Sequence, residues 1–310
     1  MESIQYLLHE QLDKKKWDDC INNATNSLIY GYSFYLDAMA KQWDALVLSA
    51  GPDSGNDYEA VMPLTYNKKY GIYYLYQPPF TAALGVFGKN ISAELLNKFL
   101  LAVPAKFKYW DIYLNHGNFF ELEGFELYQR MNYVLALNKP YNDLYAAFRS
   151  STQRNIKKFV QFKGAIKKGI PVKDVIELSA GQSQAFSKLA DADFKRMASL
   201  YKLLHKEGNA ITYGAYSNQQ LVASAAFFLS GKRAYYIVVG NHPDGKTIGA
   251  SHALINAFIE DHAGKELLLD FEGSDIHSLA FFYSSFGAVE EKCCGIKLNR
   301  LPKLVRLFKK

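Results

Sequence analysis

The residues with the clearest chemical potential lie near the end of the chain, in DFEGSDIHSLAFFYSSFG (270–287). Asp270 and Glu272 close an apolar run, and a carboxylate at the rim of a site can orient or deprotonate a reacting group. Alternate residues of a strand point to opposite faces, so the two carboxylates are not expected to form a paired acid–base site of the glycosidase kind. Each is a catalytic candidate. The alternative for each is a strand-end cap or a salt bridge.

Tyr283 is the third catalytic candidate. It lies on a short aromatic helix that is expected to stop at Gly287. Phenylalanines at 281, 282 and 286 surround it in the sequence, so Tyr283 could instead belong to the core. Even a buried phenol needs a partner for its hydroxyl.

A second candidate site is the polar stretch NHPDGKTIGAS (241–251), between an apolar strand and a helix. A helix start exposes unpaired N–H groups and the positive end of the helix dipole, and glycine lets the backbone approach an anion closely. The stretch could therefore cradle a phosphate, although no G-x-x-x-x-G-K-[ST] or G-x-G-x-x-G motif occurs. The alternative is a turn at Asp244-Gly245 and close packing at Gly249. The candidate contacts are Lys246, Thr247, Gly249, Ala250 and Ser251.

A third feature is a basic segment without any Asp or Glu from Leu144 to Lys173. Its eight cations exceed the net charge of the whole chain, +6, so the rest of the protein is mildly acidic. Such a segment favours an anionic partner, and the alternative is a solvated helix face. Arg149, Gln153 and Lys157 follow at steps of four and share one helix edge. The candidate substrate contacts here are Arg149, Gln153, Arg154 and Lys157.

The elements that must position these residues form a mixture of strands and helices. In the first part we expect helices at 33–42 and 90–107, the second with Ser92 as N-cap, and strands at 43–51, within 58–80 on either side of a turn at 67–71, at 109–116 and at 132–138. In the second part we expect helices at 141–163, 181–197, 199–207 and 250–264, strands at 170–178, 210–218, 220–230, 233–241, 265–273 and 292–298, and a loop at 242–249.

This order predicts an α+β, or mixed α/β, fold in which helices pack on largely antiparallel sheets. A boundary at Lys139-Pro140 would divide the chain into domains 1–140 and 141–310. Hydrophobic residues make up 49% of the chain and charged residues 21%, which is ordinary globular composition.

Several classes of protein are disfavoured by the composition. The sequence shows no signal peptide and no transmembrane stretch. The three cysteines, two of them adjacent, favour neither a disulfide framework nor a zinc site, so we expect no metal and a cytoplasmic location. No histidine stands in a triad or metal context, and DNA is not an expected partner.

Lys246-x-x-Gly249-x-Ser251 at a helix start, followed by a strand and a Tyr-bearing helix, resembles the GNAT acyltransferase superfamily. Its pyrophosphate signature is Q/R-x-x-G-x-G/A, so Lys and Ser depart from it here. LYAAFRSSTQRNIKKF (144–159), LLLDFEGSD (267–275) and FFYSSFGA (281–288) resemble segments of the FemAB/FemX-like group, and SFYLDAM (33–39) with PPFTAALGVFG (78–88) resembles its N-terminal half. The likeness covers about residues 25–300, without the coiled-coil arm of the classical Fem enzymes.

The resemblance implies two tandem GNAT-like domains, each a mixed, mostly antiparallel sheet flanked by helices. It implies an N-acyltransferase that moves an acyl or aminoacyl group to a primary amine, such as a peptidoglycan-precursor-like acceptor. The donor would be acyl-CoA or aminoacyl-tRNA as a co-substrate, with no tightly bound cofactor. The alternative is a tRNA- or ligand-binding protein, or an interaction protein, on a catalytically silent GNAT fold.

The resemblance also implies roles for individual residues. Tyr283 would protonate the leaving group, and one of the acidic pair would act on the acceptor amine. Backbone amides near Val238 and Val239 would polarise the donor carbonyl. Ser274, in the D-x-x-G-S pattern of the closing segment, would contact substrate.

Overall fold

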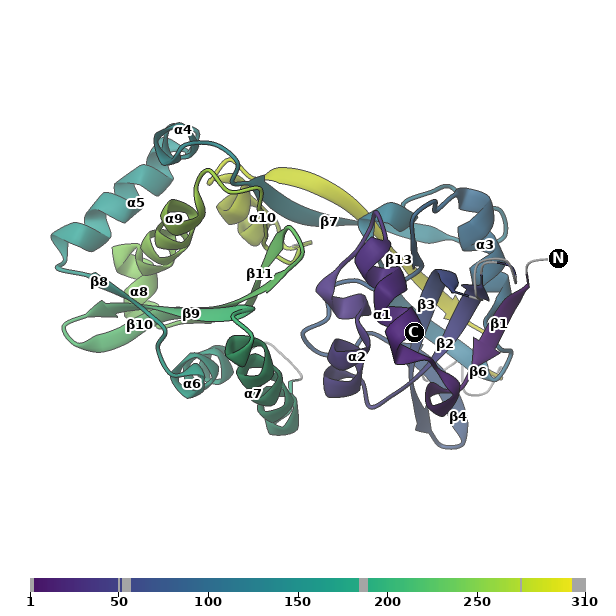
Figure 1. Ribbon diagram of the computed structural model, residues 1–310. Helices are drawn as coiled ribbons and strands as arrows, with labels where there is room; N and C mark the ends of the chain where they lie inside the picture. The colour runs from purple at the N-terminus through teal and green to yellow at the C-terminus, as the bar shows by residue number, and fades with distance from the viewer. Residues whose placement is uncertain (1–2, 50, 52–56, 184–188, 274, 303–310) are drawn as a thin grey trace. The chain divides into compact units, whose positions relative to one another are not determined.

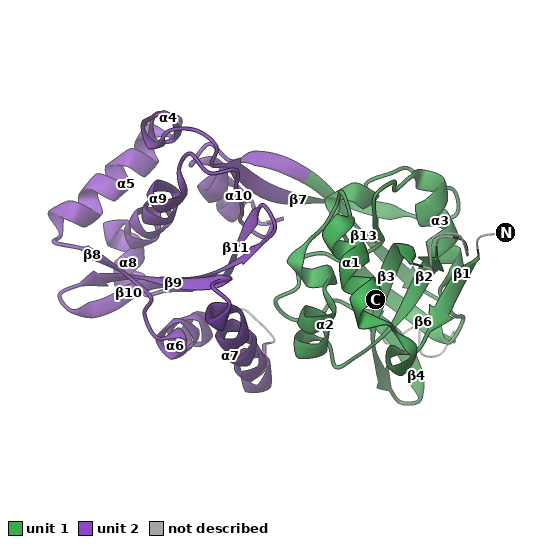
Figure 2. Ribbon diagram, viewed as in Figure 1, with its two compact units in different colours: residues 1–131, 292–310 green, residues 132–291 purple. Residues whose placement is uncertain are grey.

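The computed structural model describes residues 3–49, 51, 57–183, 189–273 and 275–302 of the 310-residue chain. Figure 2 shows its two compact units: unit 1 is Met1–Met131 with Lys292–Lys310, and unit 2 is Asn132–Glu291. This division differs from the expected domains 1–140 and 141–310. The end of β7 (Leu127–Ala136) pairs with a strand of unit 2, and β13 (Val289–Asn299) returns to pair with a strand of unit 1. Pairing between such distant segments leaves no local signal in the sequence.

Unit 1 is a sheet in the order β1-β2-β3-β4-β6-β13, with β5 added beside β3. Neighbouring strands are antiparallel except for the parallel pair β4–β6. Its helices are α1 (Lys14–Asn23), α2 (Ser33–Met39) and α3 (Ala93–Ala102), and its other strands are β1 (Ile4–Leu7), β2 (Gln42–Ser49), β3 (Tyr58–Lys69), β4 (Ile72–Tyr76), β5 (Phe87–Gly88) and β6 (Phe107–Leu114).

Both faces of the unit 1 sheet are covered, because every residue of β2 from Trp43 to Leu48 is buried. On one face, Leu46 and Met62 belong to the core that includes Phe99 of α3. On the other face α1 packs against β3. Ser92 is the N-cap of α3, as the sequence predicts, and its hydroxyl accepts a hydrogen bond from the amide of Leu95.

Unit 2 is a sheet in the order β7-β12-β11-β10-β9-β8, and β11–β12 is its parallel pair. Figure 1 shows α6 and α7 on one face and α5, α8 and α9 on the other. The helices are α4 (Tyr141–Ala146), α5 (Ser150–Gln161), α6 (Val172–Ser183), α7 (Asp191–Lys206), α8 (Pro243–Ile248), α9 (Ala250–His262) and α10 (His277–Ser284); the strands besides β7 are β8 (Ala165–Lys168), β9 (Ala210–Ser217), β10 (Gln220–Ser230), β11 (Arg233–Asn241) and β12 (Leu268–Asp270).

Close packing on both faces of this sheet follows from particular residues. The ring of Phe227 on β10 stacks on that of Phe258 on α9, with centroids 3.8 Å apart. On the other face, a Cβ at Gly240 would lie 2.7 Å from the backbone nitrogen of Ser179 on α6. Only glycine at position 240 lets α6 approach β11 this closely.

The mixed α/β class and most elements of the sequence prediction are confirmed, including the hairpin of β9 and β10 and the strand β11. The predicted strand at 170–178 is wrong, because this segment begins helix α6. Its branched apolar residues favoured a strand, but the buried positions Val175 and Ser179 are four apart, which is the period of a helix. The edge strand of the sheet is instead β8, which pairs with β9. The predicted helices at 181–197 and 199–207 are likewise wrong in their bounds, because α7 runs without a break from Asp191 to Lys206.

Two further predictions are corrected around the candidate site. The helix expected at 141–163 is divided into α4 and α5, because the backbone of Arg149 is extended and its amide donates to the carbonyl of Ser285 at 2.9 Å. The loop expected at 242–249 is mostly the short helix α8, which Gly249 joins to α9 in a left-handed conformation (φ 82°).

Candidate functional site

The candidate site opens where β11 runs past the end of β12. The two parallel strands pair from Arg233–Leu268 to Tyr235–Asp270, and β11 then continues to Asn241 without β12, paired with β10 on its other side. Beyond this point lies a cavity of about 360 Å³ within unit 2. Four helices and the free part of β11 provide its walls: Gln182, Tyr236, Val239, Asn241, Gly245, Lys246, Gly249, Ser251, His252, Leu279, Phe282 and Tyr283.

A β-bulge explains which residues of β11 face this cavity. Ala226 pairs with Val238 and Phe227 pairs with Tyr236, so Ile237 is an extra residue on β11. Without it, Tyr236 would point to the face opposite Val239 and Asn241. The bulge thus brings all three side chains to one cavity.

Tyr283 lies in the wall of the cavity, on α10, with its ring stacked on Phe271 at a centroid distance of 4.7 Å. Burial raises the pKa of its phenol well above the ordinary value, and the Glu272 carboxylate raises it further. Tyr283 therefore stays protonated at neutral pH. Neither its hydroxyl nor that of Tyr236 donates a hydrogen bond to another residue that the structure describes, which leaves both able to serve a ligand.

His252 stands in the first turn of α9 and also lines the cavity. Its Nε2 is 3.4 Å from Nδ2 of Asn155, and the edge of the Phe282 ring packs against it with centroids 4.8 Å apart. Burial lowers the pKa of this imidazole to about 4. The group is therefore a neutral hydrogen-bonding residue at physiological pH, and a weak base.

A polar corner of the cavity is held together by hydrogen bonds. The amide N–H of Asn241 donates to Oε1 of Gln182 at 2.8 Å, and the hydroxyl of Ser251 donates to Oδ1 of Asn241. Because both carboxamide oxygens accept these bonds, the NH₂ groups of Gln182 and Asn241 are left as donors. The corner suits a ligand that carries carbonyl or phosphate oxygens.

The predicted phosphate contacts lie around the junction of α8 and α9. Lys246 and Ser251 line the cavity, while Ala250 is buried and Thr247 is an exposed residue whose hydroxyl is 3.4 Å from the carbonyl of Pro243. Gly249 has a packing role as well, since a Cβ there would lie 2.4 Å from the carbonyl oxygen of Asn155. The packing alternative for Gly249 therefore has direct support, and its presence is no evidence for phosphate by itself.

Val238 and Val239 occupy the part of β11 that has no β12 partner. The side chain of Val238 is buried and that of Val239 lines the cavity. Successive residues of a strand direct their amides to opposite sides, so one of the two N–H groups points away from β10, toward the side where β12 has ended. That amide therefore faces the side of β11 where the pairing with β12 has ended.

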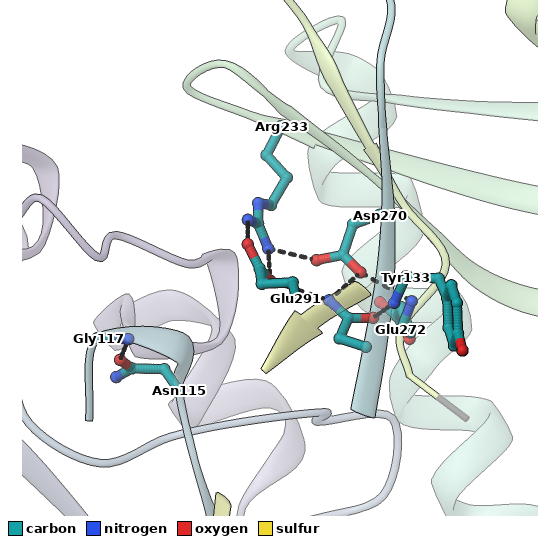
Figure 3. Close-up of polar contacts among 8 residues, drawn as sticks. Asn115, Gly117, Tyr133, Arg233, Asp270, Glu272 and Glu291 are labelled. Carbon is teal, nitrogen blue, oxygen red and sulfur yellow. Dashed lines mark hydrogen bonds and ion pairs between the residues drawn. The ribbon is translucent and has the colours of Figure 1, made fainter. Parts of the chain in front are cut away.

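Asp270 does not face the cavity; its carboxylate is buried in an ion-pair network (Figure 3). Its Oδ2 accepts from Nη1 of Arg233 at 2.6 Å, and its Oδ1 accepts from the backbone N–H of Glu272 at 2.8 Å and from Nδ2 of Asn132 at 2.9 Å. The salt-bridge alternative is what the structure shows for Asp270. Burial raises the pKa of this carboxyl and Arg233 opposes that rise.

Glu272 follows β12 in a left-handed backbone conformation (φ 61°), which is uncommon for a residue with a side chain. It is partly exposed, and its carboxylate is near enough to Tyr283 to raise the pKa of that phenol. Ser274 lies outside the described residues.

The basic helix contributes less to the cavity than the sequence suggests. Arg149 stacks over the ring of Phe281 on α10, 4.4 Å from its centroid, and donates to Ser284 at 3.2 Å. The amide of Gln153 donates to the carbonyl of Tyr145 on α4 and to that of Phe148, between α4 and α5. Arg154 and Lys157 are exposed on α5.

Sequence reasoning missed Gln182, Tyr236, Asn241 and His252. Gln182 lies near the end of α6, where the sequence predicts a helix that begins only at 181. Tyr236 faces the cavity because of the bulge, and the bulge leaves no signal in the sequence. His252, three residues beyond Gly249, could have been found as a first-turn residue of the predicted helix. In the described ranges, no cluster of three or more His, Cys, Asp or Glu could hold a metal ion, and no helix is long and apolar enough to cross a membrane.

Neither protein-family models nor curated proteins match this sequence. Solved structures do match its fold. A crystal structure of FemX superposes with a TM-score of 0.64 and 12% identity, over 99% of this chain and 100% of that one. A tandem GNAT protein from the clavulanic acid biosynthesis pathway superposes with a TM-score of 0.54 and 11% identity, over 97% of this chain and 100% of that one. L-PGS from Bacillus licheniformis superposes with a TM-score of 0.51 and 12% identity, over 95% of this chain and 92% of that one. The expected fold is confirmed: it is that of tandem GNAT proteins.

Proposed function

We propose that this protein is an N-acyltransferase that moves an acyl or aminoacyl group to a primary amine, with its donor site in the cavity of unit 2. The observation that carries the proposal is the part of β11 beyond the end of β12, beside a protonated Tyr283 whose hydroxyl has no hydrogen-bond partner among the described residues. The tandem GNAT fold, shared with FemX and with the tandem GNAT protein from the clavulanic acid biosynthesis pathway, supports it at the level of fold.

The chemistry needs three functions, which residues of the cavity and of the turn after β12 can supply. The free N–H of Val238 or Val239 would donate to the donor carbonyl oxygen as negative charge develops there. The neutral amine would attack the carbonyl carbon, and its excess proton would pass to a base, for which Glu272 is our candidate. The leaving sulfur or ribose oxygen would depart as Tyr283 gives it a proton. No covalent enzyme intermediate is required.

The donor is acyl-CoA or aminoacyl-tRNA used as a co-substrate. Both carry carbonyl and phosphate oxygens, which fit the donors of Gln182, Asn241 and Lys246. The first-turn amides of α9 add the positive end of a helix dipole on the same side.

Thermal-shift titration with CoA, acyl-CoAs and aminoacyl-tRNA tests this donor site. At least one donor should raise Tm in a concentration-dependent way. Lys246→Glu should weaken that donor about tenfold through charge reversal near phosphate. Lys265→Glu, an equal charge change on an exposed residue outside the cavity, is the matched control. Equal weakening by both variants would remove the donor site from this cavity.

A second function is favoured by the exposed Arg154 and Lys157 on α5, within a segment that lacks acidic residues. Here the protein would bind tRNA without transferring a group. Binding should weaken steeply with salt, be lost in the double variant Arg154→Glu/Lys157→Glu, and persist in Lys246→Glu. Absence of any response to both CoA compounds and tRNA would contradict both functions.

A further inference from the structure

Asp270 is a buried carboxylate whose two oxygens both accept hydrogen bonds from protein groups, and it is not among the residues that line the cavity. Its partners come from three separate places: Arg233 at the start of β11, Asn132 on β7, and the backbone of Glu272 just past β12. The carboxylate therefore connects the start of β11 to the turn that follows β12.

Arg233 is itself fixed from a second side. Its Nη2 donates to Oε1 of Glu291 at 2.5 Å, and its Nη1 donates to Oε2 of Glu291 at 3.0 Å. A two-point contact of this kind holds the guanidinium in one plane and one direction. Asn132 also bridges, because its Nδ2 is 3.1 Å from Oε2 of Glu291 as well as 2.9 Å from Asp270. Figure 3 shows Arg233 between the two carboxylates.

The residues that this network fixes are those that meet Tyr283. Between Asp270 and Glu272, Phe271 donates its N–H to the carbonyl of Tyr133 at 3.0 Å, and its buried ring stacks on the ring of Tyr283. Phe271 also lies edge-on to Tyr236, with centroids 6.0 Å apart. The left-handed turn at Glu272 is kept by the bond from its N–H to Asp270. Such a conformation persists only where its surroundings over-determine it.

We infer that Asp270, held by Arg233 and Glu291, is a positioning residue that sets Phe271 and Glu272 against Tyr283. It does not touch the reacting atoms. A catalytic effect of Asp270 rests on the proposed function. Its effect on the position of Tyr283 can be tested without measuring turnover.

Asp270→Asn is the main test, because it keeps the side-chain volume. The groups that bond to this carboxylate are all donors, so an amide NH₂ must oppose either Arg233 or the N–H of Glu272. Asp261→Asn is the matched control: Asp261 also accepts from a cation and a hydroxyl, at Lys168 and Tyr213, but lies on α9 outside the cavity wall. Asp270→Ala, which removes the acceptor entirely, is the second variant.

Two readouts separate positioning from simple loss of stability. The first is the NMR signal of Tyr283 labelled with ¹³C at its hydroxyl-bearing carbon and assigned with Tyr283→Phe. It should shift in Asp270→Asn and stay unchanged in Asp261→Asn. The second is kcat per folded molecule, which should fall at least about tenfold in Asp270→Asn while KM for the donor changes little, as expected for a misplaced group.

An unchanged Tyr283 signal in folded Asp270→Asn would overturn the inference, and an equal shift in Asp261→Asn would do the same. Where Asp270→Ala folds, its signal should shift at least as far as that of Asp270→Asn. A wild-type protein that shows no transfer with any donor would contradict the proposed function, whereas the NMR comparison would still decide whether Asp270 positions Tyr283.

Discussion

Among the described residues, each unit contains one parallel pair of strands, and the two pairs end differently. In unit 2, β11 outruns β12 and a cavity opens beside its free end. In unit 1, β4 pairs in parallel with β6 up to Tyr76 and Asp111, but the chain that follows β4 fills the space beyond. Oε1 of Gln77 accepts from the amide of Tyr113 at 3.0 Å, and Leu84 forms a parallel bridge with Leu114.

This difference between the two parallel pairs indicates which unit has room for a donor site. In unit 2 the edge of β11 has no β12 partner beyond Tyr235, whereas in unit 1 the segment that follows β4 bonds to the corresponding edge of β6. Leu84 bonds on both sides, with its N–H donating to Tyr113 and its carbonyl accepting from Asn115, each at 2.8 Å. Three buried asparagines, Asn26, Asn115 and Asn118, hold the segment around Val86 in this position. We therefore place the donor site in unit 2 alone.

The largest expected effect is on catalysis in unit 2. Tyr283→Phe removes the proposed acid and should lower kcat by about 10²–10⁴-fold, with little change in Tm because the hydroxyl has no described partner to lose. Tyr109→Phe removes a hydroxyl from a buried tyrosine of unit 1 and should leave kcat unchanged. Initial rates per folded molecule provide the comparison. Full activity of Tyr283→Phe would remove the phenol from the mechanism.

The second effect concerns the filled space of unit 1. Leu84 is 2% exposed, so Leu84→Ala should lower the free energy of unfolding by about 2–5 kcal/mol. Trp17, Trp43 and Trp110 all lie in unit 1, and their fluorescence follows its unfolding in urea. The folded variant should keep its kcat and its donor affinity. A selective loss of donor binding would show that unit 1 takes part in the site.

The smallest effect concerns pH and His252. The pKa of this imidazole is about 4 in the folded protein, against its ordinary value of 6.5, so the unfolded chain binds more protons between these values. Stability should therefore fall as pH falls from 6.5 towards 4, by up to about 3 kcal/mol from this group. His252→Gln should flatten that part of the curve. Urea unfolding followed by far-UV circular dichroism measures the free energy of unfolding at each pH. An equal slope in His252→Gln and wild type would contradict the prediction.

Local patterns in the sequence were enough for the parts of the fold that depend on local physics. The turn between β3 and β4, the cap at Ser92 and the hairpin after Ser217 follow from residue types a few positions apart. Five of the residues predicted to bind or react do line one cavity: Val239, Lys246, Gly249, Ser251 and Tyr283. The order strand, helix, strand, helix brings these residues together, and this order is part of the resemblance to GNAT proteins.

The remainder depends on contacts between distant segments. Asp270 looks like a rim residue until Arg233 and Glu291 are brought to it by β11 and β13. Helix α5 begins at a break that the amide of Arg149 makes with Ser285, over a hundred positions away. The bulge at Ile237 reorients Tyr236 without any glycine or proline to announce it.

Hydrogen exchange with bound donor tests the central claim most directly. The protein is labelled alone, with CoA or acyl-CoA, and with aminoacyl-tRNA, each at saturation. Whichever donor binds should protect amides of residues 236–252 and 279–283 in unit 2, and should leave residues 72–88 of unit 1 unchanged. Protection centred on residues 72–88, or no protection of β11 by any donor that binds, would contradict a donor site at the free end of β11.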